Sequence, residues 1–241
     1  MLTDLIGTPY KIYQVKGNKY NLDSILLANF VGKINKKIKN IYDFGCGNGV
    51  LMFYLSLKSD SKITGIEIQE ELFRLAEKNI NRNVLQKKLF VINKDIREID
   101  IKNADVIVSN PPYFKKTKNV KISQSTLRQI ARHEIKIDLD SLLKSASKSL
   151  KSKGSLYLSF KPERLTEVIN ISKNYMFETK ELRFVHPYVF KKPNLVLIKL
   201  VKNSNEGVIT QPPLVLYNDK GEMSMELKTI YKTNWNSWKK F

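Results

Sequence analysis

The sequence has few of the residues that build disulfides, metal sites and membrane spans. Among its 241 residues there is one cysteine, Cys46, and there are two histidines, so an internal disulfide and a zinc site are excluded and no metal is expected. There is no run of 18 apolar residues, so we expect no membrane span. Residues 1–10 lack the basic and apolar segments of a secretory signal. A reducing cytoplasm is therefore the expected location.

Acidic residues are scarce relative to basic ones. Lys and Arg number 42 and Asp and Glu 23, and the formal net charge of +19 is typical of proteins that bind a polyanion such as nucleic acid. Only seven of the basic residues are Arg, and Asn is abundant, so an A+T-rich genome could account for the overall charge. Residues 111–164, however, contain 13 basic and only 4 acidic residues. Codon bias does not explain such a cluster, so this stretch is the first candidate for a polyanion site.

Apolar residues alternate between two spacings along the chain. Short stretches rich in Val and Ile predict strands at 41–44, 63–68, 89–92, 104–109, 155–160, 182–185 and 194–201. Helical spacing predicts helices over 50–58, 70–81, 138–151 and 163–174, the third ended by Lys153-Gly154. The last two strands have no helix between them and are expected to pair antiparallel. The sequence therefore predicts an α/β fold with a doubly wound, mostly parallel seven-stranded sheet and an antiparallel edge strand, as one domain over 1–241.

A glycine-rich turn follows the first predicted strand of this sheet. Its glycines, Gly45, Gly47 and Gly49, allow a tight turn and a close approach of a ligand to the backbone, and Asp43 lies just before them. A dinucleotide-binding fingerprint would require glycine where this chain has Val50, and no phosphate-loop Lys followed by Ser or Thr occurs. In such sheets ligands bind at the carboxyl ends of the strands, so this turn is a candidate binding site.

Two further carboxylates follow the next two predicted strands. Glu67 ends one strand, where a carboxylate can accept hydrogen bonds from both hydroxyls of a ribose. Asp95 follows the other strand. Since the carboxyl ends of parallel strands meet at one edge, these acids are expected to lie near the glycine-rich turn.

The motif Ser109-Asn110-Pro111-Pro112-Tyr113-Phe114 ends the fourth predicted strand. The Asn110 side-chain oxygen and the Pro111 carbonyl can accept the two N–H bonds of an exocyclic amine and favour a tetrahedral nitrogen. Pro111 and Pro112 fix the backbone of the turn, and Tyr113 can stack on a planar ring. The motif resembles the (Asp/Asn/Ser)-Pro-Pro-(Tyr/Phe) motif of methyltransferases that act on a planar nitrogen, which implies methyl transfer to a nitrogen whose lone pair is delocalised.

Together these motifs resemble those of class I S-adenosylmethionine-dependent methyltransferases, which have a Rossmann-like fold. The resemblance implies S-adenosylmethionine as methyl donor, S-adenosylhomocysteine as product, and a glycine-rich turn that holds the methionyl part beside Asp43. It further implies that Asp95 accepts a hydrogen bond from the adenine amino group of the donor. The residues Asp23, Asp43, Gly45, Gly47, Gly49, Glu67, Ile68, Asp95, Ile96 and Asn110 are then the expected cofactor contacts, with Ile68 and Ile96 flanking the adenine ring.

Segments outside these motifs resemble a narrower family, the bacterial tRNA1(Val) adenine-37 N6-methyltransferases. This resemblance implies N6-methylation of an adenine in the anticodon loop of tRNA. We also expect the protein to be a monomer. Methylation of an rRNA adenine, or of a glutamine nitrogen in a protein such as a release factor, remains open, as does an RNA-binding module without catalysis. The matching segments are 14–28, 131–135, 161–165, 182–187, 194–198 and 212–217.

A target base must leave its stack to react, so phosphate contacts are needed to hold the RNA. We expect residues 114–132 to form a mobile loop ordered by RNA. Arg183 and His186 could extend this surface, although a lone histidine is more often a local hydrogen-bond donor. The expected RNA contacts are Lys115, Lys116, Lys118, Lys121, Arg128, Arg132, Arg164, Lys191 and Lys192.

The two ends of the chain have less specific patterns. Residues 1–40 are expected to cover the cofactor and 203–241 to pack on the core as an extension. Asp23 either meets the methionyl amine or caps a helix beginning at Ser24. Trp235 and Trp238 could stack on bases or pack a terminal segment onto the core.

Overall fold

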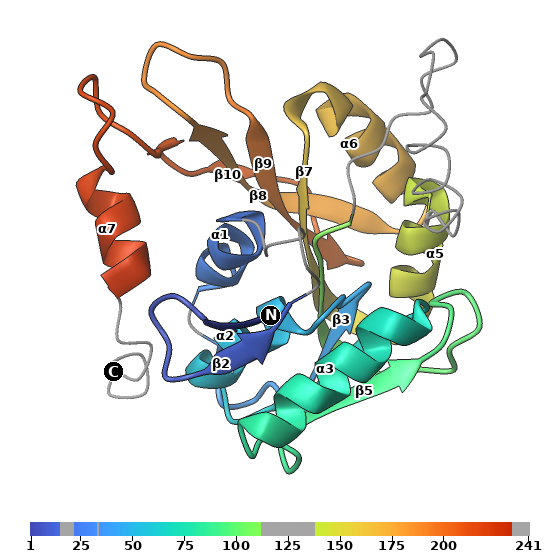
Figure 1. Cartoon of the computed structure of the whole chain (residues 1–241). Helices are drawn as coiled ribbons and strands as arrows, with labels where there is room; N and C mark the ends of the chain where they lie inside the picture. The colour runs from blue at the N-terminus through green and yellow to red at the C-terminus, as the bar shows by residue number, and fades with distance from the viewer. Residues whose placement is uncertain (15–21, 33, 112–137, 233–241) are drawn as a thin grey trace, which may run out of the picture.

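Among the residues that the structure describes, a mixed nine-stranded sheet forms the centre of the molecule (Figure 1). The computed structural model describes residues 1–14, 22–32, 34–111 and 138–232. The strand order is β10-β8-β9-β7-β6-β3-β4-β5, and β11 pairs with β8. The seven longer strands are β3 (Asn40–Phe44), β4 (Lys62–Glu67), β5 (Leu89–Asn93), β6 (Ala104–Ser109), β7 (Leu150–Phe160), β8 (Phe177–His186) and β9 (Leu195–Lys202). They confirm the seven strands predicted from the sequence.

Strand direction follows from the connections. Strands β5, β4, β3, β6 and β7 run parallel to one another, whereas β9 lies antiparallel between β7 and β8. Because β8 and β9 are joined by a short loop without a helix, an antiparallel pair is the direct result. Two short strands that the sequence did not predict, β10 (Ile209–Thr210) and β11 (Leu214–Val215), lie parallel to β8.

Helices cover both faces of the sheet (Figure 1). Leu27, Phe53, Ile80 and Leu227 come from α1, α2, α3 and α7 and share one core cluster, while α5 and α6 contribute to a second cluster. Within the described residues no helix is long and apolar enough to cross a membrane. The helices are α1 (Leu22–Phe30), α2 (Val50–Lys58), α3 (Glu70–Arg82), α5 (Leu139–Ser149), α6 (Leu165–Lys173), which a 3-10 turn over Pro162–Arg164 precedes, and α7 (Met225–Lys232).

Three local predictions need correction. Strand β8 begins at Phe177, five residues before the predicted start at Leu182. Strand β7 begins at Leu150, five residues before the predicted start, so Gly154 lies inside the strand instead of ending a helix. A Cβ at Gly154 would lie 2.9 Å from the Lys151 carbonyl oxygen, and the register with β6 shifts at this point. Helix α1 begins at Leu22 rather than at Ser24, so Asp23 lies in its first turn and is not its cap.

An N-terminal hairpin, β1 (Leu2–Asp4) and β2 (Lys11–Tyr13), is absent from the sequence prediction. Asn79 of α3 and Asn83, which directly follows this helix, bind the backbone of the hairpin as a neighbouring strand would. The Asn79 side chain accepts from the Tyr13 N–H (2.6 Å) and donates to the Tyr13 carbonyl (3.1 Å), and Asn83 does the same to Lys11 (3.1 and 2.8 Å). Asn79 also donates to the carbonyl of Asn48 (3.0 Å), which lies in the glycine-rich turn. The hairpin is therefore anchored to the helix and to the turn at once.

Candidate functional site

The predicted acids meet at one edge of the sheet, as the strand directions require. Parallel pairing places Asp43 beside Gly65 and Val108, and Glu67 beside Asn93. The carboxyl ends of β3, β4, β5 and β6 thus form a common edge, with Asp95 and Asn110 directly beyond it. Among the described residues no group of three His, Cys, Asp or Glu side chains is placed to hold a metal ion.

The glycine-rich turn has a backbone that only glycine adopts easily. Gly45, Gly47 and Gly49 have φ angles of 75°, 57° and 90°. The N–H groups of Gly45 and Cys46 donate to the Ile66 carbonyl at 2.8 and 3.1 Å, which folds the turn over the end of β4. A Cβ at Gly45 or Gly47 would meet nothing within 4 Å, whereas one at Gly49 would touch the Phe53 ring. The first two glycines therefore border open space from which a ligand can reach the backbone.

Asp43 is a buried carboxylate with an unsatisfied oxygen. It is 1% exposed, and its Oδ2 has no hydrogen-bond partner in the described part of the chain. Burial, and then the nearby charge of Glu67, raises the pKa of Asp43 well above its usual value. A buried acceptor without a donor is unfavourable, so this oxygen fits a ligand that brings an N–H donor or a positive charge.

Cys46, in the same turn, is a small buried side chain rather than a nucleophile. Burial, followed by the charges of Asp43 and Glu67, raises the pKa of its thiol well above the usual value. The reactive form of cysteine is the thiolate, which is suppressed here. A Cβ at Gly65 on β4 would lie only 2.5 Å from the Cys46 sulfur, so the thiol fills the space beside that strand.

The carboxylate of Glu67 is hydrogen-bonded to the backbone of the glycine-rich turn. Its Oε2 accepts from the Gly47 N–H at 2.8 Å and its Oε1 from the Gln69 N–H at 2.9 Å. Burial raises the pKa of Glu67, and the hydrogen bonds from backbone N–H groups oppose this rise. The carboxylate expected to bind ribose hydroxyls thus also joins the ends of β3 and β4, a role that the sequence did not indicate.

Asp95 is held by a neighbour that sequence reasoning missed. The guanidinium of Arg97 forms an ion pair with both of its oxygens, and the Arg97 N–H donates to Oδ1 at 2.8 Å. Hydrogen bonding from Arg97 holds the pKa of Asp95 below its usual value despite partial burial. The Asp-x-Arg spacing in the sequence is the signal that could have identified this pair. Ile96, which lies between Asp95 and Arg97 in the sequence, is buried, and Ile68 is half-buried.

Asn110 is oriented by serines from two distant elements. Its Nδ2 donates to Ser24 Oγ on α1 at 3.0 Å, and its Oδ1 accepts from Ser159 Oγ on β7 at 2.7 Å. Ser159 is fully buried, and the register of Ser109 with Leu158 brings it level with Asn110. Neither serine was predicted, although a serine within the apolar end of β7 is a visible signal. The two contacts restrict rotation of the amide that is expected to contact the substrate.

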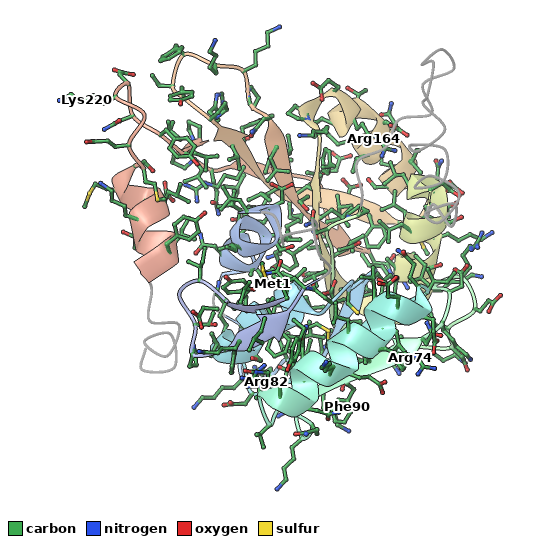
Figure 2. The ribbon with its side chains drawn as sticks, viewed as in Figure 1. Met1, Arg74, Arg82, Phe90, Arg164 and Lys220 are labelled. Carbon is green, nitrogen blue, oxygen red and sulfur yellow. The ribbon has the colours of Figure 1, made fainter. Side chains whose placement is uncertain are left out.

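The basic residues predicted to bind RNA fall into three groups. Arg164, labelled in Figure 2, directly precedes α6 and donates to Glu167 at 2.8 and 2.9 Å, while Lys191 and Lys192 are exposed between β8 and β9. The Arg183 side chain is 11% exposed and donates to Glu226 of α7 and to the Pro212 carbonyl, and its place in an RNA surface stays a prediction. The remaining predicted residues, Pro112, Tyr113, Lys115, Lys116, Lys118, Lys121, Arg128 and Arg132, lie outside the described residues, as do the loop over 114–132, Trp235 and Trp238.

Comparison with known proteins relates this geometry to a family. The family model described as methyltransferase small domain matches residues 21–181. A tRNA1(Val) (adenine(37)-N6)-methyltransferase of Tolumonas auensis is 30% identical over 190 residues, which is 78% of each chain. Another of the same name, from Aeromonas hydrophila, is 26% identical over 208 residues, or 86% of this chain and 85% of the relative.

Solved structures agree on the fold. A predicted O-methyltransferase from Agrobacterium tumefaciens has a TM-score of 0.69 at 17% identity, covering 88% of this chain and 97% of its own. A putative RNA methyltransferase from Pyrococcus horikoshii has a TM-score of 0.53 at 18% identity, covering 74% and 81%. The family match and the 30% identical relative together show that this chain belongs to the methyltransferase small domain family, alongside the bacterial tRNA1(Val) (adenine(37)-N6)-methyltransferases.

Proposed function

We propose that this protein transfers a methyl group from S-adenosylmethionine to N6 of adenine 37 in the anticodon loop of a tRNA. The observation that carries the proposal is Asn110, held between Ser24 and Ser159 at the edge where the glycine-rich turn and Asp43 lie. The bacterial relatives carry the name of this reaction. We place the reaction in the cytoplasm, with the protein as a monomer that needs no metal.

The residues at the edge fit the methyl donor. Asp43 offers the unsatisfied oxygen that a methionyl amine would pair with, and Gly45 and Gly47 border the open space beside it. We assign the ribose hydroxyls to Glu67 and the adenine to Asp95, Ile68 and Ile96, with Asp23 and Gly49 completing the set. Bound S-adenosylmethionine supplies an activated methyl group. The residues of the chain orient it and shield it from water.

On the substrate side, the chain supplies acceptors rather than a strong base. A carbonyl oxygen has two acceptor positions, and in our proposal Asn110 Oδ1 keeps one for Ser159 and offers the other to the target amine. The Pro111 carbonyl accepts the second N–H, while Pro112 and Tyr113 shape the pocket and stack on the base. Fixing both N–H bonds draws the nitrogen lone pair out of conjugation and aims it at the methyl group.

The chain's two ends and its basic residues complete the proposal. We propose one methyltransferase domain in which residues 1–40 cover the cofactor and residues 203–241 pack on the core. Leu227 and Ile230 of α7, which share a core cluster with α1 and α2, support the second assignment. Lys191 and Lys192, with Arg164 and the basic residues of 115–132, contact tRNA phosphates in this proposal.

The decisive test is mass spectrometry of nucleosides from tRNA incubated with the protein and S-adenosylmethionine. N6-methyladenosine at position 37 is the expected product. The variant Asn110→Ala should bind the cofactor normally and lose at least about 100-fold in methyl transfer, as removal of other positioned polar groups in active sites does. Asn81→Ala, an exposed asparagine on α3, is the matched control and should retain full activity.

Three outcomes would contradict the proposal. Equal activity of Asn110→Ala and the parent protein would remove Asn110 from the mechanism. Labelled methyl groups in a protein glutamine and none in RNA would favour the glutamine-nitrogen alternative. Absence of cofactor binding in calorimetry would favour an RNA-binding module without catalysis.

A further inference from the structure

The loop between β8 and β9, residues 187–194, lies at the carboxyl end of β8, which is the same edge of the sheet as Asn110 at the end of β6. Strands β7 and β8 both run antiparallel to β9, so both end at this edge. The register places Leu182 of β8 level with Ser109 of β6, through Ile198 and Leu158. The loop is then three strands from Asn110, about 15 Å across the sheet, and several residues beyond it along the strand.

This loop exposes apolar and basic side chains together. Val189 is 69% and Phe190 66% exposed, and Lys191 and Lys192 follow directly. The exposed apolar residues Val84 and Met176, in contrast, have no other strongly exposed large apolar residue beside them in the sequence. An exposed aromatic ring beside an apolar neighbour and two cations is the composition of a surface that binds single-stranded nucleic acid.

The exposed ring is held in place by a second ring. Phe190 stacks on Tyr188 with centroids 5.6 Å apart and planes 18° apart, and Tyr188 contacts Tyr217 at 5.8 Å. One face of Phe190 is therefore covered by protein, and the ring is presented as a flat platform. Lys191 Nζ lies 5.8 Å from the same ring.

Hydrogen bonds fix the backbone that carries this platform. The Lys191 N–H donates to the Tyr188 carbonyl at 3.0 Å, and His186 Nδ1 donates to the Lys191 carbonyl at 2.8 Å, the local role expected for this histidine. The Tyr217 N–H donates to the Pro187 carbonyl at 3.0 Å. A surface ordered before binding loses little conformational freedom when it binds a partner.

We infer that Tyr188, Phe190, Lys191 and Lys192, here named the aromatic tip, bind an unpaired nucleobase of the substrate RNA near the target adenine. Phe190 stacks on the base, and the two lysines contact the flanking phosphates. The inference rests on the proposed function, since it states how the same substrate is held while its target base enters the pocket.

The experiment compares variants on two RNAs. One is an anticodon stem-loop, and the other is the same stem-loop with abasic sites in place of the loop nucleotides other than the target. Phe190→Ala should weaken binding of the intact RNA about tenfold, the effect of losing one stacked base, and leave the abasic RNA unchanged. Phe190→Trp should bind as the parent does. Met176→Ala, which removes an exposed apolar side chain elsewhere, is the matched control and should have no effect.

The lysines have a separate signature. Replacing Lys191 and Lys192 by Ala should make the fall of log affinity with log salt less steep, with the magnitude of the slope reduced by about 2. The reason is that each substitution removes about one phosphate contact. This change should be equal on both RNAs, since the abasic RNA keeps its phosphates.

The outcomes separate this inference from the proposed function. Equal weakening of both RNAs by Phe190→Ala, or none at all, would overturn base stacking, as would tight binding of an acidic peptide that depends on Phe190 when RNA binding does not. If the parent protein does not methylate RNA but binds it in a manner that depends on Phe190, the proposed reaction is overturned and the role inferred for the aromatic tip is retained. Unchanged cofactor affinity and melting temperature of Phe190→Ala would show that the variant is folded.

Discussion

Two buried aspartates at opposite ends of neighbouring strands have opposite surroundings. Asp43 lies at the carboxyl end of β3, and its Oδ2 has no partner among the described residues. Asp105 lies at the amino end of β6, forms an ion pair with Lys151 and accepts from the Lys39 and Asn40 N–H groups at 2.7 and 3.0 Å. Burial raises the pKa of Asp105, but these hydrogen bonds outweigh it and bring that pKa below its usual value.

The difference shows that the two edges of the sheet have different roles. At the amino edge the chain supplies every donor that Asp105 needs, and the carboxylate joins β3, β6 and β7. At the carboxyl edge Asp43 is buried beside Glu67, and the described residues supply no donor to one of its oxygens, although an unsatisfied buried acceptor is unfavourable. When a natural protein leaves a buried polar group without a hydrogen-bond partner, the group is usually part of a functional site. A ligand at this edge would therefore gain from an interaction that the unliganded protein lacks.

The largest expected effect is on cofactor affinity at the carboxyl edge. Asp43→Asn should lower the affinity for S-adenosylmethionine about 100-fold, within the roughly 2–5 kcal/mol lost when one partner of a buried charge pair is removed. The free energy of unfolding should stay equal or rise, because the amide carries no buried charge. Calorimetric titration and denaturant unfolding measure the two quantities. Unchanged affinity would show that Asp43 has no role in binding.

The amino edge should show the reverse pattern. Asp105→Asn should lower the free energy of unfolding by about 2 kcal/mol, the scale of a hydrogen-bonded charged group, and leave cofactor affinity within about twofold of the parent. The same two measurements apply. A loss of affinity as large as that in Asp43→Asn would mean that the two edges are not separate.

The pH dependence of stability should differ in sign between the two aspartates. The pKa of Asp43 is raised on folding, so the stability it contributes at low pH is lost as the pH rises through its raised pKa. The pKa of Asp105 is lowered on folding, so its contribution is present above its ordinary pKa and is lost as the pH falls through its lowered pKa. Unfolding of the unliganded parent and both Asn variants from acid to neutral pH tests this. If the stability difference between the parent and each Asn variant changes in the same direction with pH for both aspartates, the prediction is wrong.

The smallest expected effect concerns the glycine-rich turn. Gly47→Ala should reduce stability by about 1 kcal/mol, because its φ of 57° is strained for alanine while its Cβ would meet no atom. The added methyl group would enter the space assigned to the cofactor, so affinity should fall as well. Gly221→Ala is the matched control, since Gly221 has a φ of 78° and equally open surroundings. If both variants bind the cofactor as the parent does, the space beside Gly47 is not the cofactor site.

Much of this architecture could be predicted because the signals are local. The seven strands, helix α2 and the glycine-rich turn follow from apolar spacing and from residues within a few positions of one another. The early start of β7 could not be predicted, because Gly154 is a helix stop in local terms. Its place in the strand depends also on a distant segment, since a Cβ there would lie 3.2 Å from the Ala104 carbonyl oxygen of β6 as well as close to Leu150 and Lys151. The asparagines that anchor the N-terminal hairpin were also missed, since their partners lie about 70 positions away.

The sequence by itself determined which chemical groups this protein can bring to the carboxyl edge of its sheet. These groups are Asp43, Glu67 and Asn110, at the ends of the neighbouring strands β3, β4 and β6. Only the tertiary structure decided their states. Asp43 and Asp105 look alike in the sequence, and Asn110 is oriented by Ser24 and Ser159, which are 86 and 49 positions away. The physical reason is that strand ends are set by local spacing, whereas burial, hydrogen-bond partners and pKa depend on what distant segments pack against each group.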